Sequence, residues 1–191
     1  MKIKLFITSL LMCVFFPILG RSDTFDKIRD NLTRYKTVTG DFDQTRSLKD
    51  LNIELKSQGQ FTFKFPLNLT WNQKVPFALE MMMTPDKIVQ KGVDGKEQTL
   101  TKSNQPVVFA FSSSFMSVFS GDKKLIEKHF NYKVSEEGKV WKLILDPKDS
   151  LIKKAIQSVV IHGDEFVRSV EVTEKSRNVT LINFENIKGL R

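Results

Sequence analysis

Apolar and polar side chains alternate through the stretch from residue 59 to residue 83. Large apolar groups occupy most odd-numbered positions between Phe61 and Met83, and polar groups such as Thr62 and Lys64 occupy many of the even ones. Side chains of a strand alternate between its two faces, so this pattern predicts strands with one apolar face. Two prolines, Pro66 and Pro76, interrupt the alternation and predict successive strands rather than one long ribbon.

The remainder of the chain also has a mostly period-two pattern, bounded by short helices. A helix is predicted over 23–35, where apolar residues recur at helical spacing. Short connections, such as the one around Asp94 and Gly95, predict antiparallel neighbours. We therefore expect a single, mainly β domain of the α+β class over 23–191, built as a strongly curved or half-closed antiparallel sheet with helices on one side. The further strands are predicted at 38–44, 51–55, 87–91, 98–102, 131–134, 140–145, 157–162, 166–174 and 178–184, and short helices at 122–130 and 147–156.

The segment 106–120 breaks the β pattern. Phe111, Phe115 and Phe119 recur at helical spacing, Pro106 suits the start of a helix, and Gly121 suits its end. A helix so rich in phenylalanine is consistent with ordinary core packing, and also with a movable cover over an apolar cavity. The pattern alone favours core packing.

The first 22 residues have the parts of a secretory signal peptide. Lys2 and Lys4 form a basic start, 5–19 is a mostly apolar run, and Gly20 and Ser22 are small residues near a cleavage point. A retained membrane anchor is the alternative. We predict cleavage, because the apolar run is shorter than the roughly 20 residues that a spanning helix needs.

The only cysteine, Cys13, lies inside this leader. Met12 precedes it and apolar residues follow it, whereas a lipidation site has a small residue just before the cysteine. The mature chain would then contain no cysteine, which excludes disulfide and thiol chemistry.

Charge and the remaining side chains indicate no catalytic residues, no metal site and no cofactor. The mature chain carries 27 basic and 22 acidic residues, since three of the 30 basic residues lie in the leader. Such a mild, scattered excess does not predict nucleic-acid binding. The two histidines, His129 and His162, are isolated and lack metal-ligand spacing. An enzyme that uses an apolar cavity is a remaining alternative without visible machinery.

Several short motifs, taken in order, resemble the LolA family of periplasmic lipoprotein carriers. Each motif alone is common, whereas their order and spacing together are fairly specific. They are Phe42-Asp-Gln44, the series Gly59, Pro66, Trp71 and Pro76, the turn Asp94-Gly95-Lys96, and the strand Trp141 to Pro147.

This resemblance implies an incomplete antiparallel β-barrel whose helices form a lid over an apolar cavity for acyl chains. It implies a monomeric periplasmic carrier without a cofactor, which takes acylated lipoproteins or other lipids from an inner-membrane donor complex to an outer-membrane acceptor. A lipid-sensing regulatory module of the same fold is the alternative. The expected cavity residues are Phe61, Phe63, Phe65, Leu69, Trp71, Phe77, Leu79, Met81 and Met83, and the expected lid residues are Phe109, Phe111, Phe115, Met116 and Phe119.

The chain departs from the family pattern at two places. Phe65 stands before Pro66, where the family has a basic residue that is thought to help hold the lid. The aromatic residue usual soon after the Asp-Gly-Lys turn is replaced by polar residues at 97–99. The resemblance therefore implies a divergent member whose lid closure, loading and cargo differ from the usual ones.

Overall fold

The structure is a computed structural model that describes residues 24–191, apart from the side chains of Val107, Phe111 and Ser114. The predicted signal peptide and Cys13 lie outside the described residues. Among residues 24–191, no helix is both long and apolar enough to cross a membrane.

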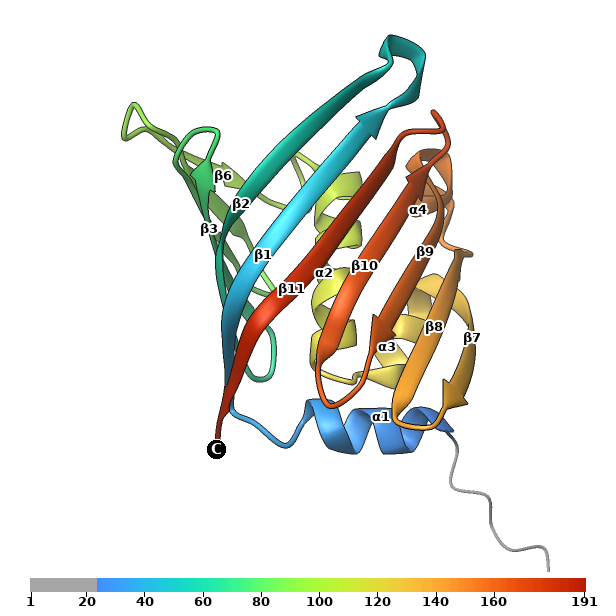
Figure 1. The fold of residues 1–191 in the computed structure, drawn as a ribbon. Coiled ribbons are helices and arrows are strands. Elements are labelled where there is room, and N and C mark those ends of the chain that lie inside the picture. The colour runs from blue at the N-terminus through green and yellow to red at the C-terminus, as the bar shows by residue number, and fades with distance from the viewer. Residues whose placement is uncertain (1–23) are drawn as a thin grey trace, which may run out of the picture.

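Eleven strands within the described residues form one antiparallel sheet (Figure 1). Its order is β6-β5-β4-β3-β2-β1-β11-β10-β9-β8-β7. Strands that are consecutive in sequence lie side by side, except for β6 and β7, which form the two edges, and the first strand pairs with the last in the middle of the sheet. The sheet runs from one edge strand to the other without closing, which confirms the predicted incomplete barrel. The strands are β1 (Thr37–Leu48), β2 (Ile53–Lys64), β3 (Asn68–Val75), β4 (Leu79–Met83), β5 (Ile88–Lys91), β6 (Glu97–Leu100), β7 (Phe130–Glu137), β8 (Val140–Pro147), β9 (Ile156–Gly163), β10 (Val167–Glu174) and β11 (Val179–Leu190).

The helices lie against one face of this sheet. In the view of Figure 1, α2 and α3 lie behind the strands, and α1 runs below the ends of β8 and β10. A 3-10 turn, η1, joins β1 to β2 at the tip of a long hairpin. The helices are α1 (Thr24–Leu32), η1 (Lys49–Leu51), α2 (Pro106–Phe119), α3 (Lys123–His129) and α4 (Ser150–Ala155).

Strand register explains why odd-numbered residues keep to one face over three strands. Phe63 pairs with Leu69 across β2 and β3, and Leu69 pairs with Met83 across β3 and β4. Directly opposed residues in antiparallel strands point to the same side of the sheet. The odd-numbered residues therefore share the face that α2 covers, and Phe63 and Leu69 are buried there.

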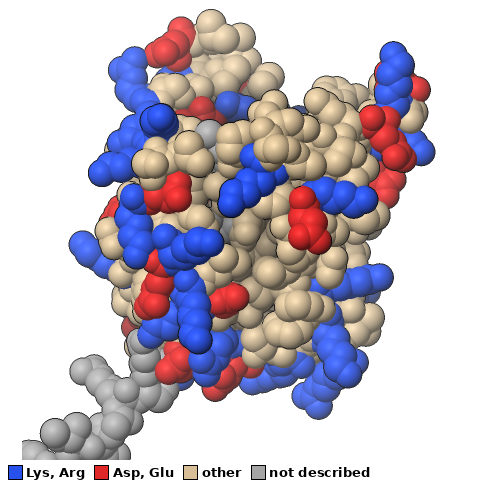
Figure 2. All heavy atoms as spheres, turned by 180° about the vertical axis from the view of Figure 1, so that it is seen from behind, with Lys and Arg blue, Asp and Glu red and all other residues tan. Residues whose placement is uncertain are grey.

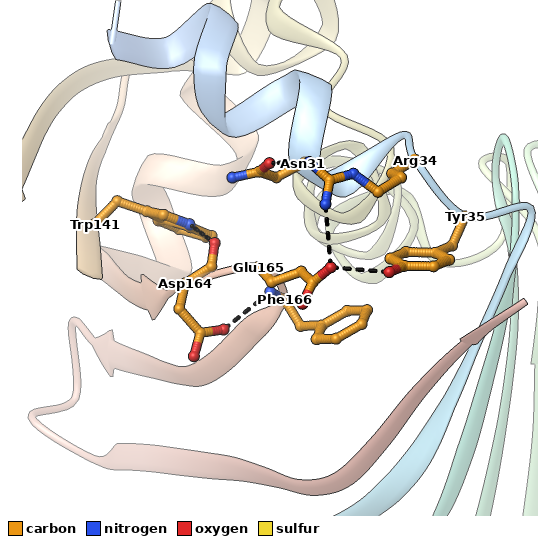
Figure 3. Close-up of polar contacts among 7 residues, drawn as sticks. All are labelled: Asn31, Arg34, Tyr35, Trp141, Asp164, Glu165 and Phe166. Carbon is orange, nitrogen blue, oxygen red and sulfur yellow. Dashed lines mark hydrogen bonds and ion pairs between the residues drawn. The ribbon is translucent and has the colours of Figure 1, made fainter. Parts of the chain in front are cut away.

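The N-terminal helix is fixed by apolar packing and by polar contacts to the β9–β10 turn (Figure 3). Phe25, Ile28 and Leu32 form its buried side. After the helix ends, the Tyr35 hydroxyl donates a hydrogen bond of 2.8 Å to Glu165. These contacts attach α1 to the end of the sheet at which β9 turns into β10.

The sequence predicted most elements at about their observed places. The helix predicted over 23–35 ends earlier, at Leu32. The strand predicted at 51–55 is continuous with the start of the next one, because β2 runs unbroken from Ile53 to Lys64. The helix at 106–120 and the following short helix are both confirmed, and Asp122 caps the latter by accepting a hydrogen bond from the Leu125 amide.

Candidate functional site

A cavity of about 500 Å³ lies between the inner face of the sheet, helix α2 and the end of α4. Its volume is in the range of about 300–1,000 Å³ that is usual for small-molecule sites. Most of its walls are apolar. The lining residues are Gln44, Arg46, Trp71, Met81, Met83, Val108, Ser112, Phe115, Ala155, Ile156, Val172, Glu174, Thr180 and Ile182.

One face of α2 forms the helical wall of this cavity. Val108, Ser112 and Phe115 are spaced by four and three residues, which places them in a row along the helix. Only Ser112 in this row is polar. The arrangement lets a single helix cover the apolar hollow of the sheet.

Polar side chains gather at one end of the cavity. An Arg46 terminal nitrogen lies 2.8 Å from a Glu174 oxygen, in an ion pair that joins β1 to β10. The other oxygen of Glu174 accepts hydrogen bonds from Ser176 and Asn178. This carboxylate therefore has three donors, and the cavity has a polar end as well as apolar walls.

Close-packed aromatic rings lie beside the cavity rather than around it. Phe119 of α2 contacts Phe63 at 5.6 Å and Phe184 at 5.7 Å between ring centroids. Phe61 contacts Phe184 at 5.0 Å. The void that Phe61, Phe63 and Phe119 help to line measures only about 10 Å³, less than a chain of methylene groups needs. This part of the molecule is packed core.

The sequence matches the family described as outer membrane lipoprotein carrier protein LolA over residues 33–190. The chain belongs to the LolA family. No curated protein sequence matches it.

The chain is also similar to several solved structures, at low sequence identity. The chain in the MucA/MucB complex of Pseudomonas aeruginosa has a TM-score of 0.50 at 10% identity, over 85% of this chain and 54% of that one. A LolA superfamily protein of Nitrosomonas europaea has a TM-score of 0.45 at 11% identity, over 89% of this chain and 94% of that one. A putative outer membrane lipoprotein-sorting protein domain of Vibrio parahaemolyticus gives 0.46 at 8% identity, over 86% and 90%.

The cavity residues expected from the LolA resemblance fall into three groups. Trp71, Met81 and Met83 line the cavity. Phe61, Phe63 and Leu69 are buried in the adjoining core, and Leu79 is half-buried. Phe65 and Phe77 are 46% and 57% exposed, because both lie in connections between strands, where the alternation of faces no longer applies.

The expected lid residues all lie on α2, and among those whose side chains the structure describes one lines the cavity. Phe115 does so, and its ring also contacts that of Phe119 at 5.1 Å between centroids. Met116 and Phe119 are buried, and Phe109 is half-buried. The side chain of Phe111 lies outside the described residues.

Sequence reasoning missed the half of the cavity that comes from the C-terminal strands. Ile156, Val172 and Ile182 line it from β9, β10 and β11. It also missed Arg46, although the pattern held a signal. Alternation along the strand predicted at 38–44 puts Phe42 and Gln44 on one face, and Arg46 is the next residue on that face.

Elsewhere, a titratable pair supports the short helix α4. His129 Nδ1 lies 3.4 Å from Asp149, which caps α4 by accepting hydrogen bonds from the amides of Leu151 and Ile152. Burial raises the pKa of Asp149, but the hydrogen bonds from Ile152, Leu151 and His129 together outweigh it, so the pKa lies below its ordinary value. No cluster of three or more metal-ligating side chains occurs among residues 24–191.

Figure 2 shows the side of the molecule that carries the helices. Uncharged side chains cover much of the middle of this face, and charged side chains gather mainly toward the side of β7 and β8. Val108 on α2 is 42% exposed although it lines the cavity. Apolar surface therefore continues from the cavity to the outside of α2.

Proposed function

We propose that the protein is a carrier that binds acyl chains of lipoproteins or related lipids and moves them between the two membranes across the periplasm. The observation that carries this proposal is the cavity of about 500 Å³ with walls formed by Trp71, Met81, Met83, Phe115 and apolar residues of β9 to β11. Burying an acyl chain stabilises a complex by about 0.8 kcal/mol for each CH₂. Broad apolar walls without many polar anchors suit that task.

The flexible side chains of the wall support a carrier rather than a narrow recognition site. Met81 lies opposite Trp71 in the register of β3 and β4, and Met83 lies opposite Leu69 on the same face. Methionine has an unbranched, adaptable side chain that fits irregular shapes. A cavity walled in this way accepts chains that differ in length or unsaturation.

Helix α2 is the proposed lid. It supplies one wall through Val108, Ser112 and Phe115, and its end is anchored through Phe119 to the aromatic core. Release of cargo would separate this wall from the sheet. A carrier of this kind needs no cofactor, and its proposed partners are an inner-membrane donor complex and an outer-membrane acceptor.

A matched pair of substitutions tests the proposal. Ser112→Phe places a ring in the cavity, whereas Ser158→Phe makes the same change on β9 at a half-buried position that does not line it. We expect Ser112→Phe to lower the affinity for a fluorescent acyl probe at least tenfold, and Ser158→Phe to leave it near the wild-type value. Wild-type protein that takes up no acyl probe, and that carries no lipid when purified from its native host, would refute the proposal.

The alternative is a lipid-sensing module that uses the same cavity. A sensor would form a stable complex with a membrane signalling protein, and its acyl ligand would change that complex rather than travel to a second membrane. Transfer of a labelled lipid from donor to acceptor vesicles by the purified protein distinguishes the two, because a sensor would bind the lipid without delivering it.

A further inference from the structure

The polar end of the cavity is built from residues of three strands. Arg46 on β1 lies opposite Thr180 on β11, and Thr180 lies opposite Val172 on β10. Glu174 follows on β10 and pairs with Arg46. All four residues line the same cavity whose far walls include Trp71 and Met81. The cavity is therefore amphipathic along its length.

Arg46 has a donor left over at this place. Its Nε atom is enclosed and has no hydrogen-bond partner among the described residues, although the guanidinium also pairs with Glu174. A buried donor without an acceptor destabilises the protein, and guanidinium groups hold several donors in a fixed plane. The side chain as a whole is 43% exposed and pairs with Glu174 through one terminal nitrogen, so other donors of the same guanidinium can meet an acceptor that a ligand supplies in the cavity.

The charge of the surroundings restricts what that acceptor is. The Arg46–Glu174 pair is neutral as a unit, and Gln44 and Thr180 beside it are uncharged. A carboxylate or phosphate bound at Arg46 would lie close to the Glu174 carboxylate and be repelled by it. An uncharged carbonyl oxygen gains the hydrogen bond without that repulsion.

We propose that the cavity orients its ligand, with an ester or amide carbonyl of an acylated molecule accepting a hydrogen bond from Arg46 and the hydrocarbon chain extending toward Trp71, Met81 and Phe115. This assignment rests on the proposed lipid-binding function and deepens it by naming the head-group chemistry. It makes Arg46 a specificity-determining residue, and Glu174 the residue that sets the preference for an uncharged head.

The test uses three competitors of equal chain length: an n-alkane, a fatty-acid methyl ester and the free fatty acid, each displacing a fluorescent acyl probe. With the wild-type protein we expect the ester to displace the probe about tenfold better than the alkane, as one hydrogen bond to a charged group allows. The fatty acid should be weaker than the ester. Arg46→Met should remove the advantage of the ester over the alkane.

Glu174→Gln gives a second and independent measurement. Glutamine still offers Arg46 an acceptor but removes the negative charge, so the preference should move from the ester toward the ionised fatty acid. Arg34→Met is the control, since Arg34 pairs with Glu165 outside the cavity, and it should behave as the wild type.

Equal displacement by ester and alkane, an ester advantage that survives Arg46→Met, or a wild-type preference for the fatty acid would each overturn the assignment. If Arg46→Met does not fold, an unchanged preference in Glu174→Gln would overturn it as well. Failure of all three competitors to displace the probe from the wild type would instead count against the cavity as a lipid site, which separates the two proposals.

Discussion

Trp71 stacks on Phe42 across an intervening strand, with ring centroids 3.7 Å apart and planes inclined by 23°. Phe42 belongs to β1 and Trp71 to β3, and the residue of β2 that lies opposite Phe42 is Gly59. The aromatic pair therefore spans the middle strand beside a residue that has no side chain. A Cβ atom at Gly59 would meet the backbone of β3 at Asn72 and Gln73, so β2 and β3 approach each other closely here.

Gly59→Ala should destabilise the protein strongly. A Cβ atom at this position would lie 2.0 Å from the backbone oxygen of Asn72, which no rotamer change can relieve. We expect a loss of about 2 kcal/mol or more in the free energy of unfolding, as for other overpacked sites. Urea denaturation measures it as a lower midpoint.

Gly92→Ala is the matched control for this change. A Cβ atom there would meet only the Asp94 side chain, at 3.5 Å. Its unfolding midpoint should stay close to that of the wild type. Equal midpoints for Gly59→Ala and the wild type would show that β2 and β3 are less closely apposed than described.

The two tryptophans should report differently on the cavity. Trp71 lines it, whereas the Trp141 indole nitrogen donates a hydrogen bond of 2.7 Å to the Asp164 backbone oxygen in the β9–β10 turn (Figure 3). In Trp141→Phe, a brominated acyl chain should quench the remaining fluorescence of Trp71. In Trp71→Phe, the same ligand should leave the fluorescence of Trp141 nearly unchanged. Quenching of both to the same extent would place the ligand elsewhere.

The sequence was sufficient to predict the wall formed by β3 and β4. Apolar residues alternate with polar ones along each strand, and the pairing of the two strands keeps the apolar residues on the same face. Trp71 and Met81 lie directly opposite each other in the β3–β4 hairpin, so the odd-numbered residues of both strands point to the same face. Phe65 and Phe77 follow the same numerical pattern but lie in the connections on either side of β3. Side chains alternate between the two faces only within strands. The pattern therefore assigned Phe65 and Phe77 to the cavity wall, although both lie between strands.

The opposite wall depends on pairing that no local pattern contains. Thr180 and Ile182 reach the cavity only because β11 pairs with β1, although more than a hundred residues separate them along the chain. The same pairing brings Glu174 within reach of Arg46. Alternation predicts which face such residues occupy, whereas the order of strands decides which residues meet them.

Removing the Tyr35 hydroxyl should loosen the N-terminal helix. This hydroxyl donates to Glu165, which also accepts from Arg34, and the Tyr35 ring stacks on Phe166 at 5.4 Å between centroids. Tyr35→Phe keeps the ring contact and removes one partly buried hydrogen bond. We expect a loss of about 1 kcal/mol in unfolding free energy. Faster amide hydrogen exchange in α1, with unchanged exchange in β1, would locate the effect.

A stability loss of the same size in Tyr132→Phe, whose hydroxyl lies on β7, would indicate a general effect of removing a tyrosine hydroxyl. Unchanged exchange throughout α1 in Tyr35→Phe would mean that apolar packing of Phe25, Ile28 and Leu32 alone holds the helix. Either result would contradict the role assigned to the Tyr35–Glu165 hydrogen bond.

Asp149 should make the end of the cavity sensitive to acid. It caps α4, whose last residue, Ala155, lines the cavity. Because the folded-state pKa of Asp149 lies below its ordinary value of about 3.9, its charge stabilises the fold above that pH. That contribution is lost as the pH falls from about 3.9 through the folded-state pKa. Asp149→Ala should cost about 1 kcal/mol at neutral pH through loss of the cap.

Asp149→Asn separates the charge from the cap. Asparagine caps helices about as well as aspartate, so this variant should keep most of the stability at neutral pH. Its deficit relative to the wild type should shrink as the pH falls below about 4, because the wild-type carboxyl then becomes protonated as well. Thermal unfolding across that pH range measures the difference. A deficit that grows in acid would mean that the Asp149 carboxyl is held in its neutral form by the fold.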